Sequence, residues 1–331
     1  MNIAPAHLDA LQAFGYTEQE ARFLYVVATH SGYFVARQFL GFSHAHWGKR
    51  TTLFWNKFER LGHVRTECFP RSGVIYHLFS RRLYRQIDRE NIRNRRAHEI
   101  DFIKRRIAIL DFVLSNNGGQ YLETESEKVR FFCDTLKIPS HFLPAKLYLG
   151  KNGSTPTVRH FVDKFPMLLL SPSVVVFTYV HEAAPGFTDF IRHLETYLPL
   201  FRQLSDFSLM YLSRSDLHFP KATELFHSLV KIPLESDIVG DLLRYFHVRK
   251  AWDEKQYARL NDSDLVFRNQ AGTRFGGERF EGLYRDWKNG RVSEDTIRQG
   301  FHTNNRKRTI CFEPCLLARI APLVADSGKN G

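Results

Sequence analysis

The sequence predicts an α+β protein with more than one domain, and three observations lead to this prediction. Helical patterns followed by two strand-like runs fill the N-terminal quarter, a long basic helical pattern comes next, and strand-like and helical segments then alternate. With 331 residues, 43% of them hydrophobic, the chain can bury more than one core. We expect an N-terminal domain at residues 1–87, a basic connecting helix and linker at 88–118, and a mixed α/β domain at 119–331.

The charge of the chain predicts a polyanionic partner. The formal net charge is +12, which favours nucleic acid or an anionic membrane surface. The excess is uneven, because 18 basic and 10 acidic residues lie between the N-terminus and Asp111. The first third of the chain is therefore where we look for a nucleic-acid contact.

Composition disfavours several other classes of protein. The 4 cysteines are too few and too scattered for a disulfide framework, so we expect a reducing cytoplasm. Cys311 and Cys315 have no second Cys/His pair at zinc-ligand spacing, and no phosphate-binding glycine motif is present, so we expect no metal and no cofactor. The N-terminus lacks a signal-peptide pattern, and no run of about 20 apolar residues exists, so we expect no membrane partner.

Three helices are predicted at the start of the chain. Thr17 and Glu20 have the spacing of a capping box, and the helix that they begin ends near Ser31-Gly32. A short helix at Val35 to Leu40 follows and is broken by Gly41. A third helix, covering residues 45–61, is capped by Ser43 and closed by Gly62.

The third helix has two faces of different chemistry. At about 100° per residue, one side collects groups suited to a core, namely Trp47, Thr51, Phe54, Phe58 and Leu61. The other side collects Lys49, Thr52, Asn56, Arg60 and, at its flank, Lys57. Cations, amides and hydroxyls of this kind contact DNA phosphates and base edges.

Two strand-like runs follow the third helix. Val64 to Phe69 and Val74 to Phe79 are separated by Pro70-Arg71-Ser72-Gly73, a turn with Pro and Gly in hairpin positions. Residues 14–87 therefore resemble a winged helix-turn-helix DNA-binding domain, a fold that serves some proteins as an interaction module instead. The resemblance implies a third helix in the major groove and a wing along the backbone or minor groove. The expected contacts are Lys49, Arg50, Thr52, Asn56, Lys57, Arg60, Arg65 and Arg71.

A single long helix is predicted from Ser80 to Leu114. Its first half is rich in arginine, which would give salt-dependent DNA affinity beside a winged helix. Its second half carries an apolar seam that suits either a homodimer through residues 100–114 or packing on the protein's own core. Asn116-Asn117-Gly118-Gly119 is the clearest linker, and we place the domain boundary there.

The second half of the chain predicts the order helix, three strands, helix, strand. The run Val174 to Val180 is the strongest strand signal, because it is β-branched and aromatic with almost no polar residue. The other predicted elements are helices at Glu125–Leu136 and Thr188–Leu204 and strands at Lys146–Leu149, Thr157–Val162, Met167–Leu170 and Phe207–Leu212.

This order resembles the core of restriction-endonuclease-like nucleases, and with the N-terminal domain it resembles the replication-relaxation family of plasmids and mobile elements. An active copy needs an acid on the second strand and acid-x-Lys on the third to hold a divalent metal. Asp163 and Glu127 could supply acids, but Val174 to Val180 contains neither acid nor lysine, and Glu182 comes after it. The resemblance therefore implies a degenerate, catalytically silent domain.

Residues 220–331 are less informative. Leu225 to Val230 and Ile238 to His247 have helical patterns, whereas the glycines of Arg268 to Arg285 favour a hairpin or an ordered loop. The basic run at residues 306–308 could touch a phosphate. His44 and His46, before the third helix, could approach phosphates or face solvent.

We therefore expect a cytoplasmic, non-enzymatic protein that binds double-stranded DNA sequence-specifically. Its role would be that of a transcriptional regulator or a replication or maintenance factor of a plasmid, phage or integrative element. Two alternatives stay open at this point, a metal-dependent DNA nuclease and a winged-helix protein-interaction module.

Overall fold

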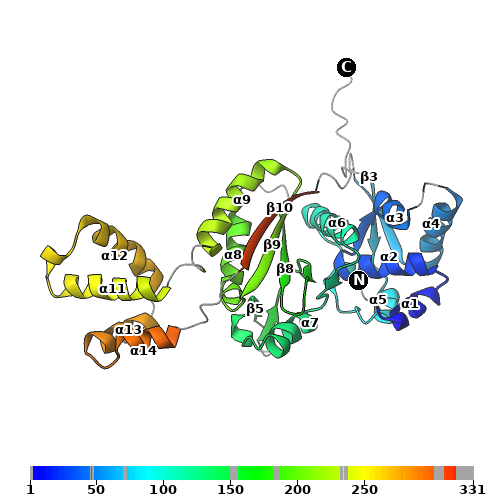
Figure 1. Ribbon diagram of the computed structural model, residues 1–331. Coiled ribbons are helices and arrows are strands. Elements are labelled where there is room, and N and C mark those ends of the chain that lie inside the picture. Colours follow the sequence, from blue (N-terminus) through cyan, green and yellow to red (C-terminus); the bar gives the residue numbers. More distant parts are fainter. Residues whose placement is uncertain are drawn as a thin grey trace, which may run out of the picture. The chain divides into compact units, whose positions relative to one another are not determined.

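Helices and strands combine in the computed structural model as the mixed α+β arrangement that the sequence predicts (Figure 1). The structure describes residues 3–44, 46, 48–69, 73–149, 156–181, 186–231, 234, 238–276, 278–301 and 309–317. The chain separates into two units: unit 1 is Met1–Phe226 with Thr309–Gly331, and unit 2 is His227–Arg308. Unit 2 is thus an insertion within the sequence of unit 1, ahead of its last strand. The proposed boundary at Asn116–Gly119 lies inside unit 1, where it forms a turn.

Unit 1 begins with four helices and a small sheet. The first and third strands of this sheet are neighbours, in the order β1-β3-β2, and all pairings are antiparallel. The elements are α1 (Pro5–Gln12), α2 (Glu18–His30), β1 (Tyr33–Val35), α3 (Ala36–Ser43), α4 (Lys49–Leu61), β2 (Val64–Phe69) and β3 (Gly73–Leu78). The two predicted strands are confirmed, whereas β1 was not expected from the sequence.

An aromatic core holds these helices against the sheet. Phe39 of α3 stacks on Phe54 of α4 with ring centroids 3.8 Å apart, and Phe23 of α2 contacts both rings edge-on. All three side chains are buried. Each such ring removes a large apolar area from water, so these contacts fix the position of α4 relative to the two helices before it.

The caps of the helices agree with the sequence in one case and differ in another. The Thr17 capping box is confirmed, since the Thr17 amide donates to Glu20 Oε2 at 2.8 Å. The prediction that Ser43 caps the third helix is wrong. Helix α3 runs through Gly41 to Ser43, and the Ser43 hydroxyl donates back to the Phe39 carbonyl at 2.7 Å. A serine hydroxyl that donates to the carbonyl four residues earlier belongs to the last turn of the preceding helix, so it does not cap the following one.

The single long helix predicted at Ser80–Leu114 is also wrong. The chain forms α5 (Arg81–Gln86), a 3-10 turn (Arg93–Arg95) and α6 (Ile100–Ser115), with turn residues after α5 and extended residues before α6. Asp88 has a left-handed backbone (φ 54°), which ends the first helix. Asn94 then donates its side-chain amide to the carbonyls of Ala28 and Thr29 in α2. At Asn94, hydrogen bonds to α2 take the place of hydrogen bonds within a helix. The periodicity of the sequence gives no sign of these tertiary bonds.

The apolar seam of α6 is buried within the chain itself. Ile103 and Ile107 form one core cluster with Tyr33 and Val35 of β1 and Ile75 of β3. Leu110 and Val113 are fully buried as well. Of the two hypotheses for this helix, the structure supports packing on the protein's own core, because Ile103, Ile107 and Leu110 of the seam are buried.

The rest of unit 1 is built on a five-stranded sheet in the order β10-β9-β8-β7-β4. Strands β8, β9 and β10 are parallel, while β7 is antiparallel to both of its neighbours. All seven residues of β8 are buried, as the sequence predicts for a central strand. The elements are β4 (Gln120–Tyr121), α7 (Glu125–Arg130), β5 (Ala145–Tyr148), β6 (Thr157–His160), β7 (Met167–Leu169), β8 (Val175–His181), α8 (Thr188–Phe201), β9 (Asp206–Ser213), α9 (Phe219–Phe226) and β10 (Thr309–Leu316).

Unit 2 is helical among its described residues. Its core joins Leu242, Phe246, Phe275, Tyr284 and Ile297 from four helices. These helices are α11 (Ile238–Asp253), α12 (Asp262–Phe275), α13 (Glu278–Lys288) and α14 (Glu294–Phe301).

The hairpin or loop predicted at Arg268–Arg285 is therefore wrong. Asn261 caps α12 by accepting the Asp264 amide at 2.9 Å, which starts a helix ahead of the glycines. Gly272 and Gly282 lie inside helices, Gly276 stands at a break, and Gly277 lies outside the described residues. Tertiary burial of an aromatic face here outweighs the cost of about 1 kcal/mol that each helical glycine imposes.

Candidate nucleic-acid interface

Helix α4 separates its side chains into a buried and an exposed face, as its 3.6-residue period requires. Thr51, Phe54 and Phe58 are buried, the two phenylalanines in the aromatic core. Gly48 precedes the helix, and its amide donates to Thr51 Oγ1 at 2.9 Å, so the first turn is held by a side chain of the buried face. The exposed face comprises Lys49, Thr52, Leu53, Asn56, Glu59 and Arg60.

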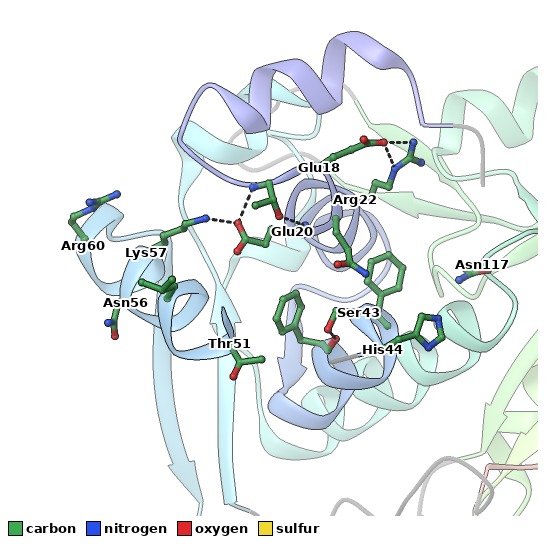
Figure 2. Close-up of a pocket in the computed structure, with 15 residues that line it drawn as sticks. Glu18, Glu20, Arg22, Ser43, His44, Thr51, Asn56, Lys57, Arg60 and Asn117 are labelled. Carbon is green, nitrogen blue, oxygen red and sulfur yellow. Dashed lines mark hydrogen bonds and ion pairs between the residues drawn. The ribbon is translucent and has the colours of Figure 1, made fainter. Parts of the chain in front are cut away.

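Four polar groups of the exposed face have no partner among the described residues. No hydrogen bond or ion pair engages the side chains of Lys49, Asn56, Glu59 or Arg60. The Thr52 hydroxyl is different, because it donates to the Gly48 carbonyl at 3.2 Å. Figure 2 shows Asn56 and Arg60 projecting away from α2. Two cations, an amide and one carboxylate are therefore available to a ligand on one side of the helix.

Lys57 has a structural partner. Its Nζ lies 2.6 Å from Glu20 Oε2, the same carboxylate oxygen that accepts the Thr17 amide. Both side chains are mostly buried, 22% exposed for Lys57 and 9% for Glu20. Figure 2 shows Lys57 reaching across to α2. This ion pair ties α4 to the capping box of α2, so Lys57 orients the exposed face.

A groove of about 990 Å³ opens beside that face, between α4, the start of α2 and the end of α3 (Figure 2). Phe39 and Phe42 contribute apolar surface to it, and Asn56 and Arg60 lie at its α4 side. Its acidic side chains are neutralised, since Glu20 pairs with Lys57 and Glu18 pairs with Arg22 at 2.8 Å. Arg60 is thus the uncompensated charge of the groove.

The β2–β3 hairpin places Arg65 away from α4. Tyr76 of β3 stacks on Trp55 of α4 at 4.5 Å, and Arg65 stands opposite His77, the next residue along β3. Because neighbouring residues of a strand point to opposite faces, Arg65 and His77 lie on the other side of the sheet. The exposed Arg65 guanidinium rests 4.2 Å from the centre of the Phe79 ring. The Arg71 side chain and turn, and the Arg50 side chain, lie outside the described residues.

A glycine and one side-chain contact that the sequence did not reveal fix the C-terminal end of α4. Gly62 has a left-handed backbone (φ 60°) and ends the helix as predicted. His63 follows it, buried, and its Nδ1 is hydrogen-bonded to the Tyr16 hydroxyl at 2.9 Å. Burial and the neighbouring Arg82 lower the pKa of His63 to about 4, so this histidine is neutral at pH 7. In the sequence His63 looks like any of the 15 histidines.

The acids considered for a nuclease site have local partners. Asp163 Oδ2 accepts His193 Nδ1 at 3.0 Å, and its Oδ1 accepts the Tyr197 hydroxyl at 3.0 Å. Burial alone raises the pKa of Asp163, but its contact with His193 brings that pKa below the ordinary value. Glu127 forms the capping box of its own helix with Thr124 and also accepts the Glu123 amide at 2.8 Å. In the described part of the chain, no three His, Cys, Asp or Glu side chains are grouped to hold a metal ion, and Glu182 lies outside that part.

Comparisons with protein-family models, curated proteins and solved structures find no match to this chain. None of the helices in the described ranges is long and apolar enough to cross a membrane.

Proposed function

We propose that residues 14–87 form a winged helix-turn-helix domain and that the protein binds double-stranded DNA sequence-specifically. The order α2, β1, α3, α4, β2, β3 supports this proposal, as does the sheet order β1-β3-β2. In such a domain α4 is the recognition helix, and α2 and α3 support it from behind. The aromatic core and the Lys57–Glu20 pair supply that support here.

The unpartnered polar face of α4 is the observation that carries the proposal. Its 13 residues form a helix of about 20 Å, which fits a B-DNA major groove of about 12 Å width. Lys49 and Arg60 lie near opposite ends and suit phosphate contacts, while Asn56 suits a bidentate contact to an adenine edge. Thr52 stands between them on the same face.

The distribution of charge supports the same partner. Basic residues outnumber acidic ones by 18 to 10 up to Asp111. Cations near DNA release condensed counterions, so affinity should fall steeply as salt rises. The Arg65 side chain, on the far face of the hairpin, is suited to a phosphate beyond the groove that α4 occupies.

We further propose a role as a regulator or a replication or maintenance factor of a mobile element, with a catalytically silent α/β part. The parallel strands β8 to β10 beside the antiparallel β7 support the likeness to nuclease cores. Strand β8 offers Thr178 and His181 but no acid or lysine. This part then contributes DNA or protein contacts without cleavage.

Selection of bound sequences from randomised duplexes tests the proposal. A DNA-reading protein should enrich one motif, and fluorescence anisotropy on that motif should show affinity that falls with salt. If no duplex is bound even at low salt by the folded protein, DNA binding is wrong.

A protein-docking surface is the second candidate, and Leu53 favours it. This side chain is 51% exposed on the outer face of α4 and lines the groove together with Phe39 and Phe42. Exposed apolar groups rimmed by polar ones are typical of protein contacts. A partner protein would bind with little salt dependence, and Leu53→Ala would weaken it more than Arg60→Ala.

A further inference from the structure

A second cavity, of about 490 Å³, lies in the α/β part of unit 1. Its walls come from α6, from α8, from the start of β5 and from the segment that precedes β7. Its size falls within the range of about 300–1,000 Å³ that is typical of small-molecule sites. This cavity is separate from the exposed face of α4 and from the groove beside it.

The lining of this cavity has more cationic side chains than its carboxylates can pair with. Asp163 is engaged by His193 and Tyr197, and Asp189 pairs with Arg192 at 3.3 Å. The two other cations of the lining, Arg105 and Lys146, form no ion pair with any residue that the structure describes. The Nε of Arg105 is buried without a hydrogen-bond partner. An anion in the cavity would satisfy both cations.

His193 adds a second unsatisfied group to the same lining. The residue is 7% exposed, its Nδ1 is held by Asp163, and its Nε2 is buried without a partner. The rings of Phe165 and Tyr197 flank it at 5.5 and 4.3 Å. Buried polar atoms normally have hydrogen-bond partners, so Arg105 Nε and His193 Nε2 are two such exceptions at one cavity. Arg105 and His193 both line the cavity, and each retains hydrogen-bonding capacity that no described protein group uses.

We propose that this cavity binds a small organic phosphate: a phosphate monoester carried on a compact sugar or nucleoside. The phosphate lies between Arg105 and Lys146, where guanidinium and ammonium groups can both donate to its oxygens. The organic body lies against Val162, Phe165 and Pro144, the apolar part of the lining. The cavity is much larger than a phosphate ion needs, which is why the ligand carries an organic group.

Helix α6 connects this cavity to the proposed DNA-binding domain. Arg105 stands between Ile103 and Ile107, which pack on Tyr33 and Ile75 of the small sheet. Further along α6, Asp111 accepts Arg37 Nη2 and the Gln38 amide of α3, both at 2.7 Å. A ligand that engages Arg105 therefore acts on the helix that holds the sheet and α3. This regulatory step rests on the proposed DNA binding, whereas the ligand site does not.

Isothermal titration of the full chain tests the site directly. The probes are ribose 5-phosphate, deoxyadenosine monophosphate and inorganic phosphate, at constant ionic strength. We expect the two organic phosphates to bind in the micromolar to millimolar range and more tightly than inorganic phosphate. No binding of either by the folded protein, or equal binding of inorganic phosphate, would overturn the proposal.

Variants locate the binding within the cavity. Arg105→Gln should weaken the better organic phosphate about tenfold or more, since hydrogen bonds to charged groups contribute at that level. Lys104→Gln is the matched control, because Lys104 is on the same helix, pairs with Asp101 and does not line the cavity. Lys146→Gln, on an exposed strand position, gives a second test if Arg105→Gln fails to fold. Equal affinity in Lys146→Gln and Lys104→Gln would place the ligand elsewhere.

Anisotropy on the selected duplex, with and without ribose 5-phosphate, tests the regulatory step. A change in DNA affinity of threefold or more that disappears in Arg105→Gln or Lys146→Gln supports it. Probe binding with unchanged DNA affinity overturns the regulation and leaves the site standing. Probe binding by a protein that binds no duplex overturns the proposed function instead, so the two failures are distinguishable.

Discussion

The Tyr25 hydroxyl of α2 donates a hydrogen bond of 2.6 Å to the Glu123 carboxylate, 98 residues further along the chain. Arg89 completes the contact, donating to Glu123 at 2.8 Å and to the Tyr25 oxygen at 3.2 Å. The Arg89 and Glu123 side chains are both over nine-tenths buried. Burial raises the pKa of Glu123 although the Tyr25 and Arg89 hydrogen bonds lower it. This triad joins the N-terminal helices to the segment after β4, which explains why the turn at residues 116–119 separates no units.

Replacing Arg89 by methionine should destabilise the protein strongly. Glu123 would remain buried beside Tyr25 without its cation, a loss of about 3–5 kcal/mol. Urea unfolding followed by circular dichroism measures this. Arg85→Met is the control, because the Arg85–Glu90 pair is exposed and contributes about 0–1 kcal/mol. Equal effects of the two substitutions would mean that the triad does not hold unit 1 together.

Stability should fall as the pH drops from 6.5 to about 4. Burial lowers the pKa of His63 to about 4 and of His77 to about 4, and that of His30 to about 3. Between the folded-state pKa values and the ordinary histidine pKa of 6.5, the unfolded chain binds more protons than the folded one. The stability contributed by keeping these histidines neutral is therefore fully present above pH 6.5 and is lost on acidification.

His63→Gln isolates one of these groups. Glutamine still offers Tyr16 an acceptor but does not titrate, so the slope of unfolding free energy against pH should decrease by about 1.4 kcal/mol per unit around pH 5. His141→Gln is the control, since His141 is exposed. An unchanged slope in His63→Gln would show that His63 is not held neutral in the folded state.

The exposed face of α4 should set the salt dependence of DNA binding. Lys49→Ala and Arg60→Ala should each lower the slope of log affinity against log salt by about 1, because each removes one phosphate contact. Fluorescence anisotropy at several salt concentrations measures the slope. Arg130→Ala removes an equal charge from the exposed surface of α7 and should leave the slope unchanged. Identical losses in all three variants would indicate nonspecific attraction to the whole protein.

Lys57 should behave differently from Lys49, although the helical pattern places both on the polar side. Lys57→Met breaks the pair with Glu20 and should cost about 1–3 kcal/mol of folding free energy. In the double variant Lys57→Met/Glu20→Gln much of that cost should be recovered, since no charge is left unpaired. Urea unfolding measures the coupling. Lys57 would instead be a DNA contact if the folding costs of Lys57→Met and Glu20→Gln were additive and Lys57→Met lowered the salt slope of DNA binding as Lys49→Ala does.

These residues show what the sequence could and could not predict. The period of α4, the capping box at Thr17 and the buried strand β8 are local patterns, and each appears in the structure as expected. Lys57 and Asn94 behave differently because their partners lie on another helix. The periodicity of the sequence carries no information about such tertiary partners. For this reason it predicted one continuous helix across α5 and α6 and an unpaired Lys57. The exposed groups of the candidate site were predictable, whereas the contacts that orient them were not.

Asp163 provides the test of catalysis in the α/β part. Its carboxylate accepts from His193 and Tyr197 and has no acid or lysine of β8 beside it, so we expect a structural role. Asp163→Asn should lower stability by about 1–3 kcal/mol, because two buried donors lose a charged acceptor. Supercoiled plasmid incubated with the protein and Mg²⁺ or Mn²⁺ should stay intact with both the original chain and the variant. Metal-dependent nicking that disappears in Asp163→Asn but persists in Tyr197→Phe would instead establish a nuclease. Tyr197→Phe removes one of the same hydrogen bonds and leaves the carboxylate in place, so a purely structural loss of nicking would appear in both variants.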